Sequence, residues 1–253
     1  MMRSFFPLRF LFTLLLAGAL SSTAAAQDQL RADASNDWLI QDATVLTVTN
    51  GTIENGDILV RNGDIARVGE DLTAPSGVET YDASGEYVMP GIVEAHQHMA
   101  ISNVNEATNQ VTAEVGVGDV LDPYDIGIYR ALAGGVTTAH VMHGSANPIG
   151  GRNETIKLRY GVTNPQALKM DGAPRTVKFA LGENPTGLYG QGRDQVPATR
   201  MGVEQVIRTA LQKAERYMEA KEAYQNGERA RPPAHSERME ILAGVLRGEI
   251  LVQ

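Results

Sequence analysis

The sequence predicts an α/β protein, namely an incomplete TIM (β/α)8 barrel preceded by a small antiparallel β-sandwich domain. Residues 38–89 alternate short β-type runs with Asn-Gly turns, which indicates hairpins. Residues 90–253 alternate apolar strand-like runs with helical runs, which indicates parallel strands covered by helices. This second part is shorter than the roughly 250 residues of a closed barrel. The barrel is therefore open, completed by another chain, or cut short.

Residues 1–26 have the pattern of a secretory signal peptide. Arg3 and Arg9 give a basic start, residues 10–20 are apolar, and residues 24–26 are alanines suited to cleavage. The apolar run is too short to span a bilayer comfortably, although an uncleaved N-terminal anchor is an alternative. We expect an exported protein, periplasmic or secreted, without membrane contact after cleavage.

The composition excludes several function classes. The formal net charge is −8, and this acidic balance argues against nucleic acid as a partner. The absence of cysteine excludes disulfides, thiolate metal sites and a cysteine nucleophile. No Gly-x-Ser-x-Gly elbow occurs, which removes the commonest signature of serine hydrolases.

Residues 27–89 form the predicted small β domain, and its first ten residues are expected to be a loose terminus. The pairs Asn50-Gly51, Asn55-Gly56 and Asn62-Gly63 each have the composition of a hairpin turn. Between and beside them, the pattern predicts strands over residues 38–48, 57–61, 64–69, 78–82 and 87–89.

Residues 90–253 form the predicted N-terminal part of a barrel, ending near its fifth strand. Asp122 as N-cap and Pro123 at the first helical position predict a helix that ends at Ala133. The remaining pattern predicts strands over residues 92–98, 136–142, 154–159, 176–181 and from 250, with helices over 202–224 and 236–247.

His96 and His98 carry the main chemical signal. Side chains two apart in a strand share a face, so both imidazoles and the Glu94 carboxylate point the same way. Two imidazoles on one strand can chelate a divalent ion. A His-x-His pattern alone is weak, but a preceding Pro-Gly, an apolar strand and an acid two residues earlier make a much rarer combination.

The stretch 89–98 (MPGIVEAHQH) resembles the first barrel strand of the amidohydrolase superfamily, Pro-Gly-(Leu/Phe)-(Ile/Val)-Asp-x-His-x-His. Glu94 replaces the more usual Asp and leaves the metal ligands intact. Residues 131–138 (ALAGGVTT) and 144–151 (GSANPIGG) resemble exported bacterial members of the imidazolonepropionase-like/prolidase-like branch. The resemblance identifies the chain as an N-terminal fragment of such a metal-dependent hydrolase.

The resemblance implies hydrolysis of C–N bonds in amides, cyclic amides or dipeptides, with one or two divalent ions, zinc by preference. It implies His96 and His98 as metal ligands and Lys178 as a bridging ligand after carbamylation, with Glu183 as the alternative bridge. Lys178 could instead be a packing lysine whose amine meets an acid. The resemblance places the remaining histidines and the general-base Asp beyond residue 253, so the fragment is expected to be inactive.

Other candidates remain open. Asn147 and Arg152 follow a strand and are candidate substrate-binding residues, although the glycines around them equally fit a tight loop. His140 and His143 are three apart on a strand and cannot both be ligands without a bend. We expect a small-molecule or dipeptide substrate, with homo-oligomerisation left open. The alternative function is a non-catalytic exported fragment or binding module with a degenerate barrel.

Overall fold

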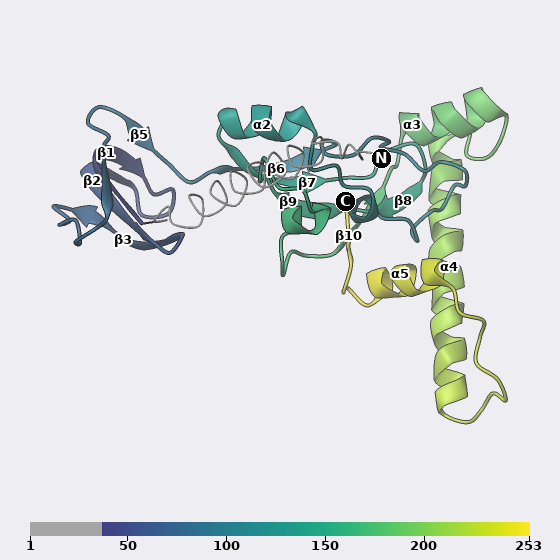
Figure 1. Ribbon diagram of the computed structural model, residues 1–253. Helices are drawn as coiled ribbons and strands as arrows, with labels where there is room; N and C mark the ends of the chain where they lie inside the picture. The colour runs from purple at the N-terminus through teal and green to yellow at the C-terminus, as the bar shows by residue number, and fades with distance from the viewer. Residues whose placement is uncertain (1–36) are drawn as a thin grey trace, which may run out of the picture. The chain divides into compact units, whose positions relative to one another are not determined.

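The computed structural model describes residues 37–253, which fall into two compact units that divide between Pro90 and Gly91 (Figure 1). The predicted signal peptide lies outside the described residues. Among residues 37–253, no helix is both long and apolar enough to cross a membrane.

The first unit is one five-stranded sheet. Its order is β3-β2-β1-β4, and β5 also pairs with β1. The pairs β1–β2 and β2–β3 are antiparallel, but β4 and β5 run parallel to β1. The prediction of a wholly antiparallel domain is therefore wrong, because residues 71–78 cross over to the free edge of β1. The strands are β1 (Trp38–Leu46), β2 (Thr52–Arg61), β3 (Asp64–Glu70), β4 (Glu79–Asp82) and β5 (Tyr87–Val88).

The Asn-Gly pairs of this unit serve different purposes. Asn62 and Gly63 both adopt positive φ, 53° and 83°, and join β2 to β3 in the predicted hairpin. Asn55 also has a positive φ, but Asn55-Gly56 lies inside β2, where the register to β1 shifts between Ala43 and Val45. The prediction of a turn there is wrong, because an irregular ladder takes the left-handed residue without reversing the chain.

The second unit holds two three-stranded sheets, ordered β6-β7-β9 and β11-β10-β8. Helices α2, α4 and α5 accompany them (Figure 1). The strands are β6 (Ile92–Gln97), β7 (Val136–Val141), β8 (Ile149–Arg152), β9 (Glu154–Lys157), β10 (Thr176–Phe179) and β11 (Leu251–Val252). The helices are η1 (Val117–Asp119), α2 (Ile126–Ala133), η2 (Pro165–Leu168), α3 (Glu183–Thr186), η3 (Gly187–Gln191), α4 (Arg200–Gln225) and α5 (Glu237–Leu246).

Strand direction in this unit is mixed. The pairs β6–β7 and β10–β11 are parallel, as an α/β layer requires. In contrast, β9 runs antiparallel to β7, and β8 runs antiparallel to β10. No helix lies between β7 and its neighbour β9, so no crossover unit forms there and β9 returns antiparallel. The unit has an α/β fold, and barrel closure stays a prediction.

Two apolar clusters stabilise the second unit. Val177 of β10 packs with Ala210 and Ala214 of α4 and with Ile241 and Leu242 of α5. The other cluster joins α2 to β7, through Ile128, Ala139 and Val141. Side chains on the outer face of each strand therefore meet the helices, and alternate residues face the opposite side.

Helix α2 begins three residues later than predicted. Its N-cap is Asp125, whose Oδ1 accepts a hydrogen bond of 2.7 Å from the Gly127 amide. The Asp122 carboxylate instead accepts from the Tyr124 amide at 2.9 Å, within a turn that precedes the helix. Two Asx residues stand within one turn of each other, and the second one forms the cap.

The long loop between β6 and α2 is tied to β8. The Thr112 amide donates to the Ile149 carbonyl at 3.0 Å, and the Arg152 amide donates to the Val115 carbonyl at 2.8 Å. Residues 111–116 thus run parallel to β8 through two isolated bridges. The preceding segment contacts the loop after β7, where the Gly144 amide donates to the Val104 carbonyl and the Glu106 amide donates to the His143 ring.

Candidate metal centre

Strand β6 places the two predicted metal ligands side by side. The ring centroids of His96 and His98 lie 5.1 Å apart, and their planes are inclined by 79°. Gly91 allows the start of β6 to approach β7, because a Cβ there would lie 2.2 Å from the Thr137 hydroxyl oxygen. The Pro-Gly signal before the strand therefore has a packing reason.

A hydrogen bond fixes the tautomer of His98. Its Nδ1 lies 2.8 Å from the Met142 carbonyl oxygen, and a carbonyl oxygen can only accept. Nδ1 therefore carries the proton, and Nε2 keeps its lone pair for a metal. The Met142 amide in turn donates to the Gln97 carbonyl at 2.8 Å, which joins the end of β7 to the end of β6.

Glu94 supports the same strand. Its carboxylate accepts a hydrogen bond of 3.1 Å from the backbone amide of His96. Partial desolvation lowers the pKa of the His96 imidazole, and the charges of Lys178 and His98 lower it further. The ring is therefore neutral at pH 7, the state in which imidazole binds metals.

Lys178 is buried in β10, only 6% exposed. It shares a face with Thr176, opposite the Val177 side chain that packs on the helices. Burial lowers the pKa of its amine. Because the Lys178 charge also lowers the pKa of His96 and His140, these side chains occupy one neighbourhood.

His140 and His143 have both ring nitrogens occupied. His140 contacts the hydroxyls of Thr155 and Thr176, each at 2.9 Å. The Nδ1 of His143 donates to the Gly144 carbonyl at 2.9 Å, and its Nε2 accepts from the Glu106 amide at 2.8 Å. Neither ring offers a free lone pair, so both are structural histidines.

Glu183 does not join the histidine pair. It is exposed and begins α3, beyond the end of β10. Within residues 37–253, no group of three or more His, Cys, Asp or Glu side chains could hold a metal ion. His96 and His98 are thus a ligand pair, with Lys178 as the nearest further donor among the predicted residues.

The two predicted substrate residues have other contacts. Asn147 is fully buried, and its side-chain amide donates to the Glu106 and Asn109 carbonyls and to the Thr112 hydroxyl, at 2.8–2.9 Å. It therefore holds the loop instead of facing solvent, where a substrate would lie. These contacts are those of a tight loop, which the glycines around Asn147 equally fit.

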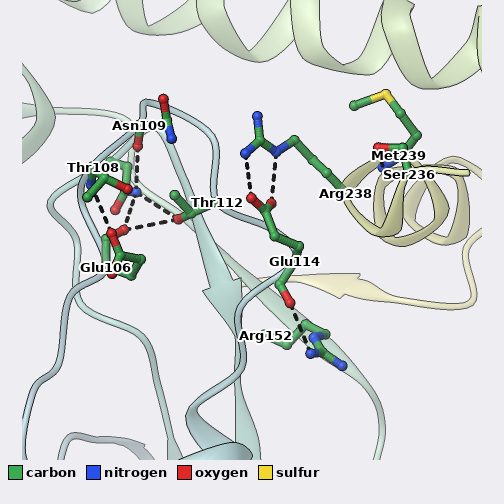
Figure 2. A network of polar contacts seen from close by, with 10 residues as sticks. Glu106, Thr108, Asn109, Thr112, Glu114, Arg152, Ser236, Arg238 and Met239 are labelled. Carbon is green, nitrogen blue, oxygen red and sulfur yellow. Dashed lines mark hydrogen bonds and ion pairs between the residues drawn. The ribbon is translucent and has the colours of Figure 1, made fainter.

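Arg152 lines a cavity of about 170 Å³ whose lining does not include His96, His98 or Lys178. Its guanidinium donates to the Glu114 carbonyl at 3.1 Å and lies 3.6 Å from the Asp119 carboxylate. Figure 2 shows the hydrogen bond from Arg152 to Glu114 beside the ion pair between Glu114 and Arg238. The contacts of Arg152 thus belong to the polar network around the loop.

Glu106 has no distinguishing signal in the sequence. The structure places it eight residues after His98, in contact with His143. The one signal in the sequence that could indicate a binding residue is the position of Glu106 in the loop after the strand of the histidine pair. Such loops carry binding residues more often than the strands beneath them.

Comparison with known proteins identifies relatives of similar sequence and fold. The described fold superposes on an amidohydrolase from Thermotoga maritima MSB8 with a TM-score of 0.75 and 37% identity, over 83% of this chain and 55% of that one. An amidohydrolase, tasK, from Hapsidospora irregularis is 34% identical over 179 residues, which are 63% of this chain and 18% of the relative. A dihydroorotase from Pelobacter propionicus is 46% identical over 61 residues, or 24% of this chain and 14% of the relative.

No family model matches the sequence. The chain spans about half the length of the Thermotoga structure and less than a fifth of the two curated relatives. The α/β fold and the match to an amidohydrolase structure over 83% of this chain define the class of protein. The chain belongs to the amidohydrolase superfamily.

Proposed function

We propose that the protein to which this chain belongs hydrolyses C–N bonds in amides, cyclic amides or dipeptides with the help of a divalent metal, zinc by preference. The single observation that supports this most strongly is the geometry of His96 and His98. Two imidazoles bound tetrahedrally to one zinc ion, at about 2.0–2.1 Å per bond, would have centroids roughly 5 Å apart. The observed separation is 5.1 Å.

The donor set fits such an ion in part. His98 presents Nε2, because its Nδ1 donates to the Met142 carbonyl. His96 is neutral at pH 7, and burial moves the pKa of Lys178 towards the neutral amine that carbamylation needs. When bound, the ion supplies Lewis-acid chemistry that polarises a carbonyl and makes water more acidic.

The chain's own residues contribute the positions of the donor groups. Met142 orients His98, Glu94 restrains the backbone of His96, and the buried amine of Lys178 faces the same neighbourhood. We also propose a small-molecule or dipeptide substrate and export to the periplasm or the medium, which the pattern of residues 1–26 supports.

The test is metal content and hydrolysis in the full-length protein, with His96→Ala and His98→Ala. Each variant should lose bound metal after dialysis and should lose at least about 100-fold in rate on a panel of dipeptides and cyclic amides, more than outer-shell changes usually cost. His235→Ala is the control, because that ring is exposed and lies 3.7 Å from the Glu237 carboxylate. Full metal content and full activity in His96→Ala would contradict the proposal.

A further inference from the structure

A carboxylate occupies the loop beside the histidine pair. Glu106 lines a cavity of about 250 Å³ together with Ser102, Asn103, Asn105 and the His143 ring. The lining combines polar residues from 102–106 with the apolar side chains of Val115, Val117 and Val120. A mixed lining of this kind is typical of a small-ligand site.

The backbone of Glu106 is held by three buried side chains. Its amide donates to Nε2 of His143 at 2.8 Å, and its carbonyl accepts from the Thr112 hydroxyl at 3.1 Å and the Asn147 amide at 2.8 Å. His143, Thr112 and Asn147 are 3%, 2% and 0% exposed. Figure 2 shows the contact between Thr112 and Glu106. Moving this backbone would leave buried polar groups without partners, so the backbone of Glu106 is fixed.

Two consecutive residues, Met142 and His143, form hydrogen bonds with His98 and with Glu106. Met142 accepts the hydrogen bond from His98, and the next residue, His143, accepts the one from Glu106. His98 and Glu106 are thus hydrogen-bonded to two consecutive residues at the end of β7. A group held by Glu106 would therefore lie in the same part of the fold as His98.

The Glu106 carboxylate is an exposed acidic group. The side chain is exposed and accepts a hydrogen bond of 3.1 Å from the Thr108 amide. Within residues 37–253, no lysine or arginine forms an ion pair with it. Hydrogen bonds from Thr108 lower its pKa, so the group is ionised at neutral pH.

We propose that Glu106 determines specificity by binding a cationic group of the substrate, an ammonium or guanidinium, within this cavity. That the bound molecule is a substrate rests on the proposed hydrolase function, whereas binding of a cation does not. Glu106 selects by charge complementarity, and His143, Thr112 and Asn147 act as positioning residues. A neutral analogue would form a weaker hydrogen bond with the carboxylate and bind less tightly.

The test is calorimetric titration of the full-length protein with L-lysine and with L-6-hydroxynorleucine, in which a hydroxyl replaces the ammonium. Neither probe contains an amide bond, so binding is measured without hydrolysis. The wild-type protein should bind lysine about tenfold more tightly, as expected for a charge-assisted hydrogen bond. Glu106→Gln should bring the two dissociation constants together. Glu219→Gln, an exposed change on α4 with the same loss of charge, should keep the preference.

Equal affinity for the two probes, no measurable binding of lysine, or a preference that survives in Glu106→Gln would each overturn the proposal. The hydrolase function is judged separately by metal content and turnover. Normal hydrolysis without a lysine preference would defeat the cation site alone. A lysine preference in a protein without metal or hydrolysis would defeat the proposed function alone.

Discussion

Strand β6 and the neighbouring strand β7 carry the same residue type for opposite purposes. His96 and His98, at the end of β6, each keep a ring nitrogen free of protein partners, and their rings lie side by side. His140 and His143, on β7 and just beyond it, have every ring nitrogen bonded. The difference shows that saturation of the ring, not the presence of histidine, separates candidate ligands from structural residues.

Burial explains why the two strands differ. An imidazole nitrogen can stay open without a penalty only where water or a ligand reaches it, and His96 is exposed. His143 is 3% exposed, so an unpaired nitrogen there would cost the full desolvation free energy. The histidines of β7 therefore tie loops together, whereas those of β6 remain available to a metal.

The largest expected effect comes from removing a saturated ring. His143→Ala should lower the free energy of unfolding by about 3 kcal/mol, because it leaves a cavity and breaks the hydrogen bonds to Glu106 and Gly144. Urea unfolding at pH 7.5 in a metal chelator measures this change. The matched control is His96→Ala, which should cost less than about 1 kcal/mol because the ring is exposed. Equal losses in the two variants would contradict the comparison.

A smaller effect should follow from disturbing the contact between the two strands. Gly91→Ala places a Cβ 2.2 Å from the hydroxyl and 2.3 Å from the methyl group of Thr137, so one strand must shift. We expect a loss of about 2 kcal/mol in urea unfolding, as for other overpacked sites. Thr137→Gly removes the obstructing atoms. In a protein that carries Thr137→Gly, adding Gly91→Ala should therefore cost much less stability than it does in the wild-type protein. A purely additive pair would show that the strain lies elsewhere.

Much of the fold follows from local sequence rules. Helices α4 and α5 and the Asn62-Gly63 turn follow from short-range patterns, and they appear where the sequence predicts them or within two residues. The strand directions of β8 and β9 were not predictable in the same way. They depend on how a short connection after β7 closes in space, which residue types alone do not specify.

In the candidate site too, local features were predictable from the sequence and long-range contacts were not. Spacing places His96 and His98 on one face, and the ring contact has that geometry. Their roles as metal ligands stay predictions. The burial of Asn147 and the position of Glu106 arise from contacts across about 40 residues of chain, between the loop after β6 and the loop after β7. Such long-range pairing leaves no pattern in a single sequence, so neither assignment could be made before the structure.

The smallest expected effect is a dependence of stability on pH between 7.5 and 5.5. Desolvation, ahead of every other cause, lowers the pKa of His140 and His143 below the ordinary value of 6.5. For His143, the Gly144 carbonyl and the Glu106 charge oppose this shift, and for His140 the charges of His96 and Lys178 add to it. The unfolded chain therefore takes up protons first, and stability that is complete above about pH 6.5 is lost as the pH falls through that value. The midpoint of urea unfolding in a chelator should be lower at pH 5.5, and His140→Gln should reduce the fall while His235→Gln leaves it unchanged. A midpoint that is constant or rises towards pH 5.5 would show that the β7 histidines are not held neutral by burial.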